Sequence, residues 1–567
     1  MINLRSELQN YLKEALEKAA VAGDLATVSI EKVSVQYPPA MKDTVYDYAS
    51  PIALIVGKQL KINPTEVAEK ILKHFLKPDF IKQVEIVAPG FINFVLNPDW
   101  MVKKLDNIVE EGEFFGNSDL GKGETVDLEF VSANPTGIPT FGNGRALFWA
   151  DSLGKVLEKS GYAVTREYYI NDAGNQVNKY GESVLRRILQ KNGIDVPFPE
   201  DLYKGKEVFS LAKEVEETLV EESSHKFTEQ DLEDKEFLQK ISDVSVKITM
   251  QSIKKMLEDV CKVKYDVWFS EKTLHESGDV TKVLEELKKR GHTYEKDGAL
   301  WFTSTKFGDD KDRVLVKEDG EVTYLVADVA YHLNKFRRGF NKIIDFWGAD
   351  HFGYIKRLES AIAAMGEDTS RLKIIITQMI NVLENGEKIK MSKRAGTSVP
   401  LNEVVESAGL SASRFFINMT ALSSHMDFDL NLAKEQSDKN PVFYVQYAFV
   451  RLASILRKAQ ETNIIENQAS TEDARVPLNS VAETALMRTI FRYPEVLEDV
   501  ADSWDVQRLP HFAIELAKSI HYFYDSVPIL NAESRELQTA RLALALAAKT
   551  TLGNLLDTLG VEKLQIM

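Results

Sequence analysis

The chain has 567 residues, which suggests three or four domains of about 150 residues each. Hydrophobic residues make up 44% of the chain, which is ample for packed cores. Its formal net charge of −16 argues against indiscriminate binding of nucleic acid, although basic segments such as 388–394 and 451–458 can still meet RNA phosphates. The single cysteine, Cys261, excludes a disulfide framework within the chain and a zinc cluster built on cysteines. Because the histidines are scattered, we expect no protein-held structural metal.

Residues 1–20 are predicted to form an amphipathic helix with Leu4, Leu8, Leu12 and Ala15 on one face. The segment is charged and lacks the uncharged apolar core of a signal peptide. No run of about 18 uncharged apolar residues occurs in the sequence, so we expect no membrane-spanning helix and a cytoplasmic protein.

Three regions follow one another along the chain. Residues 1–112 mix helices with short strands, residues 113–434 alternate strands and helices, and residues 435–567 are predicted to be helical throughout. The highly charged, helical segment 180–290 interrupts the alternation. We interpret it as an insertion into a nucleotide-binding fold.

Residues 125–178 carry the strongest local signal. Val126, Leu128 and Phe130 alternate with polar residues, as in a strand with one buried face. A turn with several glycines, an apolar helical pattern and a second strand at 164–170 follow, which together predict a βαβ unit. The free N–H groups and dipole of such a helix N-terminus favour an anion such as a nucleotide phosphate. The alternative is a glycine turn that only packs a helix closely on a sheet.

A second signal lies at residues 388–396, KIKMSKRAG, where four cations surround one serine and one glycine. Such a segment fits a loop that closes over a polyphosphate. Taken alone, such a charge run is more typical of a solvated loop.

Seven segments resemble the class I arginyl-tRNA synthetases of the bacterial type: EFVSANPTG, YYINDAGNQ, DKDRVLVK, TYLVADVAYH, GADHFGYIKR, KMSKRAGT and NPVFYVQYA. The resemblance covers essentially the whole chain in family order. It implies that residues 113–434 form an α/β Rossmann-like catalytic domain that contains an insertion. It also implies an N-terminal α/β module at 1–112 that contacts the tRNA D-loop, and a C-terminal all-α bundle at 435–567 that binds the anticodon.

The resemblance places the first family signature, usually His-x-Gly-His, on residues 140–143. Both histidines, which help to stabilise the reacting phosphate, are replaced here by Thr140 and Asn143. Neither replacement carries a positive charge, and losing one donor of this kind costs about 10²–10³ in rate. In the second signature, Lys390 and Lys393 are expected to neutralise the β- and γ-phosphates of ATP.

ATP is expected between the glycine-containing turn and the second signature. The predicted ATP contacts are Gly142, Gly144, Met391, and the pair Asp350 and His351. The last two follow the strand predicted at 343–347, and active-site groups collect at the carboxyl ends of strands in such sheets. A satisfied structural histidine is the alternative for His351. Mg²⁺ is expected to travel with ATP, held by its phosphates.

Arginine recognition needs carboxylates for a guanidinium and an ammonium group. Tyr324 and Asp328 are four residues apart and share one face of a helix, and the resemblance assigns guanidinium recognition to them. Asp328 could instead cap that helix or pair with a protein arginine. By the resemblance, Glu129 and Asn134 hold the α-amino and carboxyl ends of the substrate. The alternatives are a strand-edge carboxylate and a turn asparagine.

For tRNA, the resemblance points to Phe91 and Asn93 as a platform for a D-loop base, because an aromatic ring beside an amide suits an unstacked base. Tyr444, Tyr447 and Arg451 share one helix face and are expected to meet anticodon bases. Core packing is the alternative for each aromatic residue.

The predicted function is an arginine–tRNA ligase that uses L-arginine, ATP and tRNA, works as a monomer and needs no side-chain nucleophile. One rival is a catalytically weakened paralogue that acts as an RNA-binding or regulatory protein, supported by the loss of both signature histidines. A second is an adenylyltransferase that acts on another acceptor, which the helical C-terminal region argues against.

Overall fold

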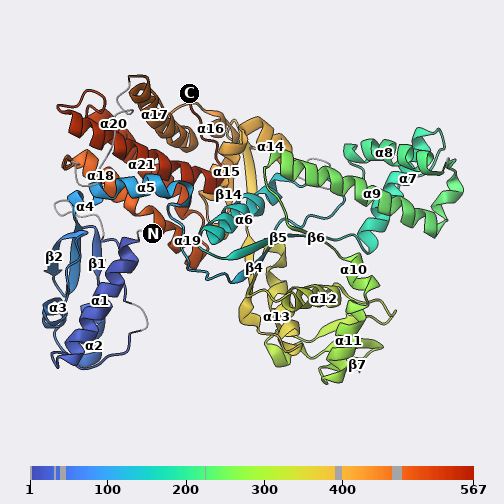
Figure 1. Cartoon of the computed structure of the whole chain (residues 1–567). Helices are drawn as coiled ribbons and strands as arrows, with labels where there is room; N and C mark the ends of the chain where they lie inside the picture. Colours follow the sequence, from blue (N-terminus) through green and yellow to red (C-terminus); the bar gives the residue numbers. More distant parts are fainter. Residues whose placement is uncertain (1–2, 31–32, 39–45, 224, 390–398, 463–475) are drawn as a thin grey trace. The chain divides into compact units, whose positions relative to one another are not determined.

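In the computed structural model, residues 3–30, 33–38, 46–223, 225–389, 399–462 and 476–567 are described (Figure 1). The chain forms two compact units. One consists of Met1–Ser118 together with Ser437–Met567, and the other of Asp119–Gln436. Contacts therefore join the first and third predicted regions into a single unit.

The unit of residues 119–436 is built on a five-stranded, fully parallel sheet in the order β11-β10-β4-β5-β6. Its strands are β4 (Thr125–Glu129), β5 (Ala163–Ile170), β6 (Val267–Ser270), β10 (Lys342–Gly348) and β11 (Leu372–Thr377). The helix α6 (Phe141–Lys159) crosses from β4 to β5. The predicted βαβ unit and the α/β Rossmann-like class are confirmed.

The central strand β4 is buried on both faces, so the prediction of a strand with one buried face is wrong. Val126 and Leu128 are buried as expected, but Asp127 and Glu129 between them are buried too. Parallel sheets carry helices on both faces, which leaves a central strand no solvent side. Here α12 (Tyr324–Arg337) supplies groups that contact the polar side chains of β4.

The predicted insertion, 180–290, is wrong at its carboxyl end, because β6 within it is an edge strand of the parallel sheet. At four residues, β6 is too short to produce a recognisable sequence period. The inserted helices come earlier: α7 (Asn175–Lys191), α8 (Lys206–Ser223) and α9 (Lys235–Lys255), followed by the π-helical turn Met256–Val260. They pack around their own core, which includes Val184, Ile188, Val215 and Ile241.

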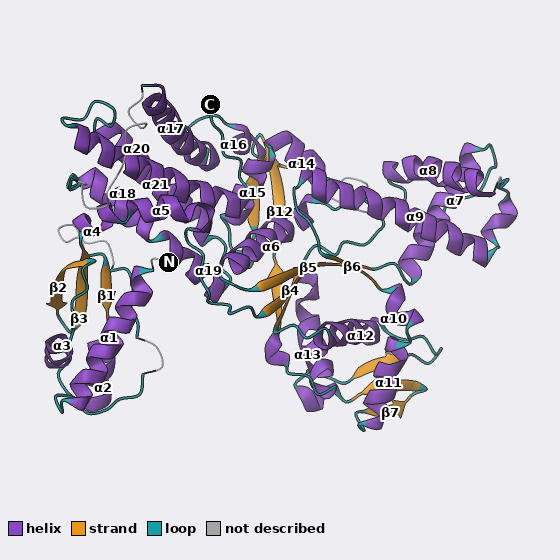
Figure 2. Cartoon of the chain, viewed as in Figure 1, coloured by secondary structure: helices purple, strands orange, loops and turns teal. Residues whose placement is uncertain are grey.

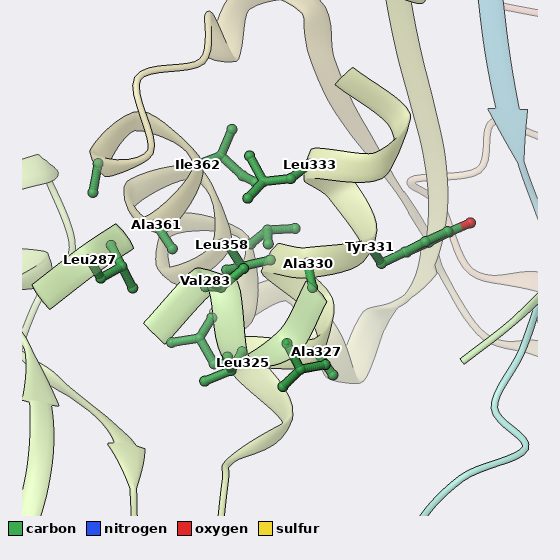
Figure 3. Close-up of a cluster of buried hydrophobic side chains, with 14 of the residues drawn as sticks. Val283, Leu287, Leu325, Ala327, Ala330, Tyr331, Leu333, Leu358, Ala361 and Ile362 are labelled. Carbon is green, nitrogen blue, oxygen red and sulfur yellow. The ribbon is translucent and has the colours of Figure 1, made fainter. Parts of the chain in front are cut away.

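Two smaller sheets complete this unit. One is antiparallel, and its strands in order are β7 (Thr293–Lys296), β8 (Ala299–Phe302) and β9 (Arg313–Val316). The same part of the unit contains the helices α10 (Lys272–Glu276), α11 (Asp279–Lys289), α12 and α13 (Ile355–Ala364). The helices α11, α12 and α13 share the apolar core of Figure 3, in which Val283, Leu333 and Leu358 are buried. The other sheet has the order β13-β12-β14, with strands β12 (Ile380–Glu384), β13 (Glu387–Lys388) and β14 (Met426–Asp429). The helices of this part are α14 (Leu401–Ala408), α15 (Leu410–Asn418) and α16 (Leu430–Lys434).

The unit of residues 1–118 and 437–567 combines an antiparallel sheet, β1-β3-β2, with helices from both ends of the chain (Figure 2). Its N-terminal elements are α1 (Leu4–Val21), β1 (Tyr48–Ser50), α2 (Ile52–Leu60), α3 (Pro64–Lys73), β2 (Ile81–Val87), β3 (Phe91–Leu96), α4 (Pro98–Lys103) and α5 (Leu105–Glu111). The helices of its second part are α17 (Pro441–Glu461), α18 (Val481–Phe491), α19 (Tyr493–Ser503), α20 (Arg508–Ser526) and α21 (Arg535–Leu559). The predicted apolar face of α1 is confirmed, because all four of its named residues are buried. Among the helices of the described ranges, none is long and apolar enough to cross a membrane.

Candidate active site

A cavity of about 710 Å³ lies where β4, β10 and β11 end. Its walls come from the loop after β4, the first turn of α6, the turn after β10 and the segment between β11 and β12. From β4 the sheet continues to β5 on one side and to β10 on the other, so this edge is the topological switch point. Open α/β sheets bind their ligands in the crevice at such a point.

Thr140 and Asn143 line the cavity and cap α6. The backbone N–H of Thr140 donates to Asn143 Oδ1 over 2.9 Å, and the Thr140 hydroxyl lies 3.1 Å from the same oxygen. Because Oδ1 faces these donors, the amide nitrogen Nδ2 is the end of Asn143 that can donate to a bound anion. The pair thus combines a helix cap with a donor at the cavity wall.

The two glycines predicted to meet ATP have different surroundings. Gly142 lines the cavity, and a Cβ added there would meet Thr140 Oγ1 at 3.4 Å, an ordinary contact. Gly144 is buried, and a Cβ added there would lie 2.6 Å from Leu401 Cδ1 of α14. The structure therefore gives Gly144 the packing role that was the alternative for this turn.

Asp350 and His351 also line the cavity, in the turn Ala349–Tyr354 that follows β10. Their side chains are 82% and 60% exposed, and His351 Nε2 lies 3.5 Å from Asp350 Oδ2. The exposure of His351 differs from that of a buried structural histidine. Lys390, Met391 and Lys393 lie outside the described residues.

Asp328 lies on the second turn of α12 and accepts a hydrogen bond of 2.6 Å from the Tyr354 hydroxyl. Thr323, not Asp328, is the N-cap of this helix, so one alternative for Asp328 is wrong. Burial raises the pKa of Asp328, although the Tyr354 hydroxyl acts in the opposite direction. Tyr324, the first residue of α12, is 67% exposed.

Glu271 is a buried carboxylate near Asp328 that the sequence offered no reason to single out. It is 6% exposed and lies 3.5 Å from His275 Nε2. Burial raises its pKa, and the negative charge of Asp328 raises it further. No sequence signal marked Glu271, because it follows the short strand β6 inside the supposed insertion.

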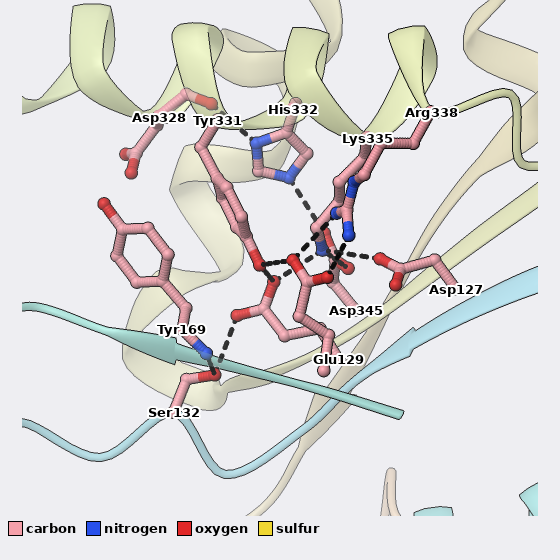
Figure 4. A network of polar contacts seen from close by, with 11 residues as sticks. Asp127, Glu129, Ser132, Tyr169, Asp328, Tyr331, His332, Lys335, Arg338 and Asp345 are labelled. Atoms are coloured by element: carbon pink, nitrogen blue, oxygen red, sulfur yellow. Dashed lines mark hydrogen bonds and ion pairs between the residues drawn. The ribbon is translucent and has the colours of Figure 1, made fainter. Parts of the chain in front are cut away.

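Glu129, at the carboxyl end of β4, lies directly behind the cavity wall. Ser132, which lines the cavity, donates to Glu129 Oε1 over 2.8 Å. On the other side, Glu129 Oε2 lies 2.8 Å from the Tyr331 hydroxyl and 2.6 Å from Lys335 Nζ (Figure 4). Glu129 is 7% exposed and belongs to the central strand of the sheet, so the alternative of a strand-edge carboxylate is wrong.

Asn134 lines the same cavity, and its Nδ2 donates to Gln176 Oε1 over 2.7 Å. Asp172 accepts hydrogen bonds from Ser270 Oγ and the Lys272 backbone at the start of α10. Asn134 therefore borders the site, whereas Asp172 holds the junction of β6 and α10 together.

The predicted D-loop contacts lie in the other unit, on β3. Phe91 and Asn93 are on one face of this strand, opposite the buried Ile92, Phe94 and Leu96. Asn93 Oδ1 has no hydrogen-bond partner among the described residues. A buried amide oxygen without a partner is unusual in proteins.

The predicted anticodon contacts gather against α20. The ring of His521 lies 4.5 Å from that of Tyr444 and 5.7 Å from that of Tyr447. The Arg451 guanidinium lies 4.9 Å from the Tyr447 ring centroid and pairs with Asp525 at 2.8 Å. Both tyrosines are half-buried, so they form an aromatic edge of the helical part rather than its core.

This arrangement of sheet, switch-point cavity and helical insertion defines a class I aminoacyl-tRNA synthetase. Residues 104–423 match the family model described as tRNA synthetases class I (R), catalytic domain. Residues 6–96 match the arginyl tRNA synthetase N terminal domain, and residues 445–567 match the DALR anticodon binding domain.

The chain belongs to the arginyl-tRNA synthetase family. It is 40% identical over 564 residues to an arginine–tRNA ligase of Bacillus subtilis and 41% identical over 572 residues to one of Geobacillus kaustophilus, with 99% of each chain covered. Among solved structures, Thermus thermophilus arginyl-tRNA synthetase matches with a TM-score of 0.76 at 20% identity, covering 100% of both chains. Plasmodium falciparum arginyl-tRNA synthetase matches with a TM-score of 0.72 at 17% identity, also covering 100% of both chains. These two structural matches bear on the fold alone.

Proposed function

We propose that the chain joins L-arginine to tRNA at this cavity, in two steps that its own residues position. The arginine carboxylate attacks the α-phosphate of ATP, which forms arginyl-adenylate and releases diphosphate. A hydroxyl of the terminal tRNA ribose then attacks the adenylate carbonyl, which forms arginyl-tRNA and releases AMP. Catalysis is by positioning and charge stabilisation, so no side chain acts as a nucleophile.

One observation carries the choice of arginine. The negative charges of Glu129, Glu271 and Asp328 raise the pKa of the Tyr169 hydroxyl, and the Tyr169 backbone N–H donates to Ser132 of the cavity wall over 3.1 Å. Arginine has two cationic ends, and each can neutralise part of this cluster. Glu129 receives the α-ammonium group, and Asp328 with Glu271 receives the guanidinium, which forms strong charge-assisted bonds with carboxylates.

ATP lies over the first turn of α6 in this proposal. Gly142 lets it approach the backbone closely, and Asn143 Nδ2 donates to the α-phosphate as negative charge develops there. Mg²⁺ enters as part of the ATP complex, and the described residues form no cluster that would hold a metal by itself. Tyr324 and Asn134 border the bound arginine, and Asp350 with His351 borders the nucleoside.

For tRNA, the proposal assigns the D-loop to Phe91 and Asn93 and the anticodon to Tyr444, Tyr447 and Arg451. Half-buried aromatic rings beside polar groups suit the stacking of unpaired bases. A cytoplasmic location and a monomeric state belong to the same proposal. Size-exclusion chromatography with light scattering tests the monomer.

The test is charging of a bulk tRNA pool with labelled arginine, with lysine and glutamine as controls. We expect ATP-dependent charging with arginine alone. Substitution Asp328→Ala should raise the KM for arginine about tenfold to a hundredfold, as expected for loss of a bond between charged groups. Asp319→Ala, an exposed aspartate of the same unit, is the matched control and should leave that KM unchanged. Charging with lysine or glutamine, or an unchanged KM in Asp328→Ala, would contradict the assignment.

Binding of tRNA without any charging would favour the catalytically weakened paralogue. The whole-chain matches to arginine–tRNA ligases do not favour that alternative. They also give no support to an adenylyltransferase that acts on another acceptor.

A further inference from the structure

Lys335 is a fully buried cation with no part in the mechanism described above. It lies near the carboxyl end of α12, on the face that also carries Asp328 and Tyr331. Its Nζ lies 2.6 Å from Glu129 Oε2, 2.7 Å from Asp345 Oδ1 and 3.1 Å from Asp127 Oδ2 (Figure 4). The contacts with Glu129 and Asp345 are hydrogen bonds and the contact with Asp127 is an ion pair, so three carboxylates surround this one cation.

Lys335 and Ser132 contact the Glu129 carboxylate from opposite sides. Ser132, in the cavity wall, donates to one carboxylate oxygen of Glu129, and Lys335 donates to the other. Rotation of the Glu129 carboxylate would break both bonds. The orientation that Glu129 presents toward the cavity therefore depends on a cation that never reaches the cavity.

His332 adds a second cation to the same network. Its Nδ1 lies 2.7 Å from the carbonyl oxygen of Asp328 and its Nε2 lies 2.8 Å from Asp345 Oδ2. Both ring nitrogens face oxygen acceptors, so both carry protons and the ring is an imidazolium. Burial alone lowers the pKa of His332, but the hydrogen bond and charge of Asp345 outweigh burial and raise it.

The carboxylates of the network outnumber its cations. The carboxylates are Asp127, Glu129, Glu167 and Asp345, and the cations are Lys335, His332 and Arg338, which pairs with Glu167. Burial raises the pKa of Asp127 to about 7, and the charges of Glu167 and Asp345 add to this rise, so a proton on Asp127 offsets part of the negative excess near neutral pH. The α-ammonium group of arginine at Glu129 would add a positive charge to this network.

We propose that Lys335 is a positioning residue for arginine, which holds the Glu129 carboxylate in the orientation that receives the α-ammonium group of the substrate. This inference rests on the proposed role of Glu129. Lys335 acts only through Glu129 and touches no substrate. It therefore affects the binding of arginine and leaves the binding of ATP unchanged.

The experiment compares Lys335→Met, Glu129→Gln and the double variant by charging kinetics at saturating tRNA. Methionine keeps the unbranched side chain as far as Cε and removes the charged Nζ. We expect Lys335→Met and Glu129→Gln each to raise the KM for arginine about tenfold, the size of one lost charge-assisted bond, with an unchanged KM for ATP. The double variant should be no worse than Glu129→Gln alone, because coupled residues are not additive. Lys342→Met, at the amino end of β10, is the matched control and should behave as the wild type.

Three results would overturn the inference. The first is an unchanged KM for arginine in Lys335→Met while Glu129→Gln raises that KM. The second is an equal rise in the KM values for arginine and ATP in Lys335→Met. The third is a further tenfold rise in the KM for arginine when Lys335→Met is added to Glu129→Gln. If Lys335→Met does not fold, the double variant, which loses one charge of each sign, is compared with Glu129→Gln. Equal KM values then support the inference and a further tenfold rise overturns it. An unchanged KM in Glu129→Gln overturns the role of Glu129 together with the inference, whereas a wild type that charges no arginine overturns the proposed function itself.

Discussion

Asn143 combines two tasks that a substitution can separate. Its Oδ1 accepts from Thr140 and caps α6, and its Nδ2 is the donor proposed for the α-phosphate. Asn143→Asp keeps the capping oxygen and removes the donor, so we expect kcat for charging to fall about 10²–10³-fold, the usual cost of one such donor. Thermal unfolding should be unchanged, which separates this loss from a loss of the cap.

Asn143→Ala is the companion variant, because it removes the donor and the cap together. It should lose as much kcat and also lose about 1 kcal/mol of stability. Charging at the wild-type rate by Asn143→Asp would show that Asn143 does not reach the phosphate.

A pH dependence follows from the half-buried Asp328 and the buried Glu271 at the proposed guanidinium site. Burial raises the pKa values of Asp328 and Glu271 above the ordinary carboxyl range near about 4. As the pH falls from neutral toward that range, these groups take up protons earlier than exposed carboxyls, and arginine loses its partners. The positive charge of His332 acts in the opposite sense, because it lowers the pKa of Asp328, but burial outweighs it.

We therefore expect the KM for arginine to rise on acidification and to level off above the raised pKa values. Charging kinetics over this pH interval, with circular dichroism as a check on folding, provide the measurement. Asp328→Asn should flatten the dependence. A KM for arginine that falls on acidification would contradict the assignment.

At the scale of elements, β4 and α12 show where sequence patterns stop being informative. The alternation in 125–130 correctly predicted a strand, but it also predicted that Asp127 and Glu129 face solvent. These residues are buried because α12, about 200 residues later, places Lys335 against them. A charge whose partner lies so far along the chain has no local signature. The network was therefore beyond prediction, whereas the strand itself was not.

The helix α6 gives the opposite result. Its start at the glycine-containing turn and its place beside the cavity followed from the sequence, because a cap, a turn and an apolar period are local features. The sequence did not predict which residue packs against each glycine of this turn. Gly144 packs against Leu401 of α14, which only the fold brings to it. Glu271 was missed for the same reason as β6, since four residues make too short a pattern.

At the scale of the whole molecule, the proposed D-loop and anticodon contacts belong to one compact unit built from both ends of the chain. Glu495 of α19 joins the two ends. Its carboxylate accepts from the Arg5 backbone N–H at 2.9 Å, from the Tyr48 hydroxyl at 2.6 Å and from the Tyr37 hydroxyl. Glu495 has 0% exposure, so these donors have no ready replacement in water. Within this unit, Glu495 is one of the residues that link the module with the proposed D-loop platform to the helices with the proposed anticodon cluster, and Arg488 with Asp47 at 2.8 Å is another such link.

Substitution Glu495→Ala should therefore impair the binding of tRNA and spare that of the small substrates. Each donor left unpaired costs about 1–3 kcal/mol, so residues 1–118 and 437–567 should unfold at a lower temperature. Because the two tRNA platforms then lose their fixed separation, we expect the KM for tRNA to rise while the KM values for arginine and ATP stay unchanged. Glu495→Gln keeps the shape and one acceptor and should be intermediate, and Glu533→Ala, an exposed position after α20, is the matched control. A rise in all three KM values, or an unchanged KM for tRNA in a destabilised Glu495→Ala, would show that the two platforms do not act on tRNA as one body.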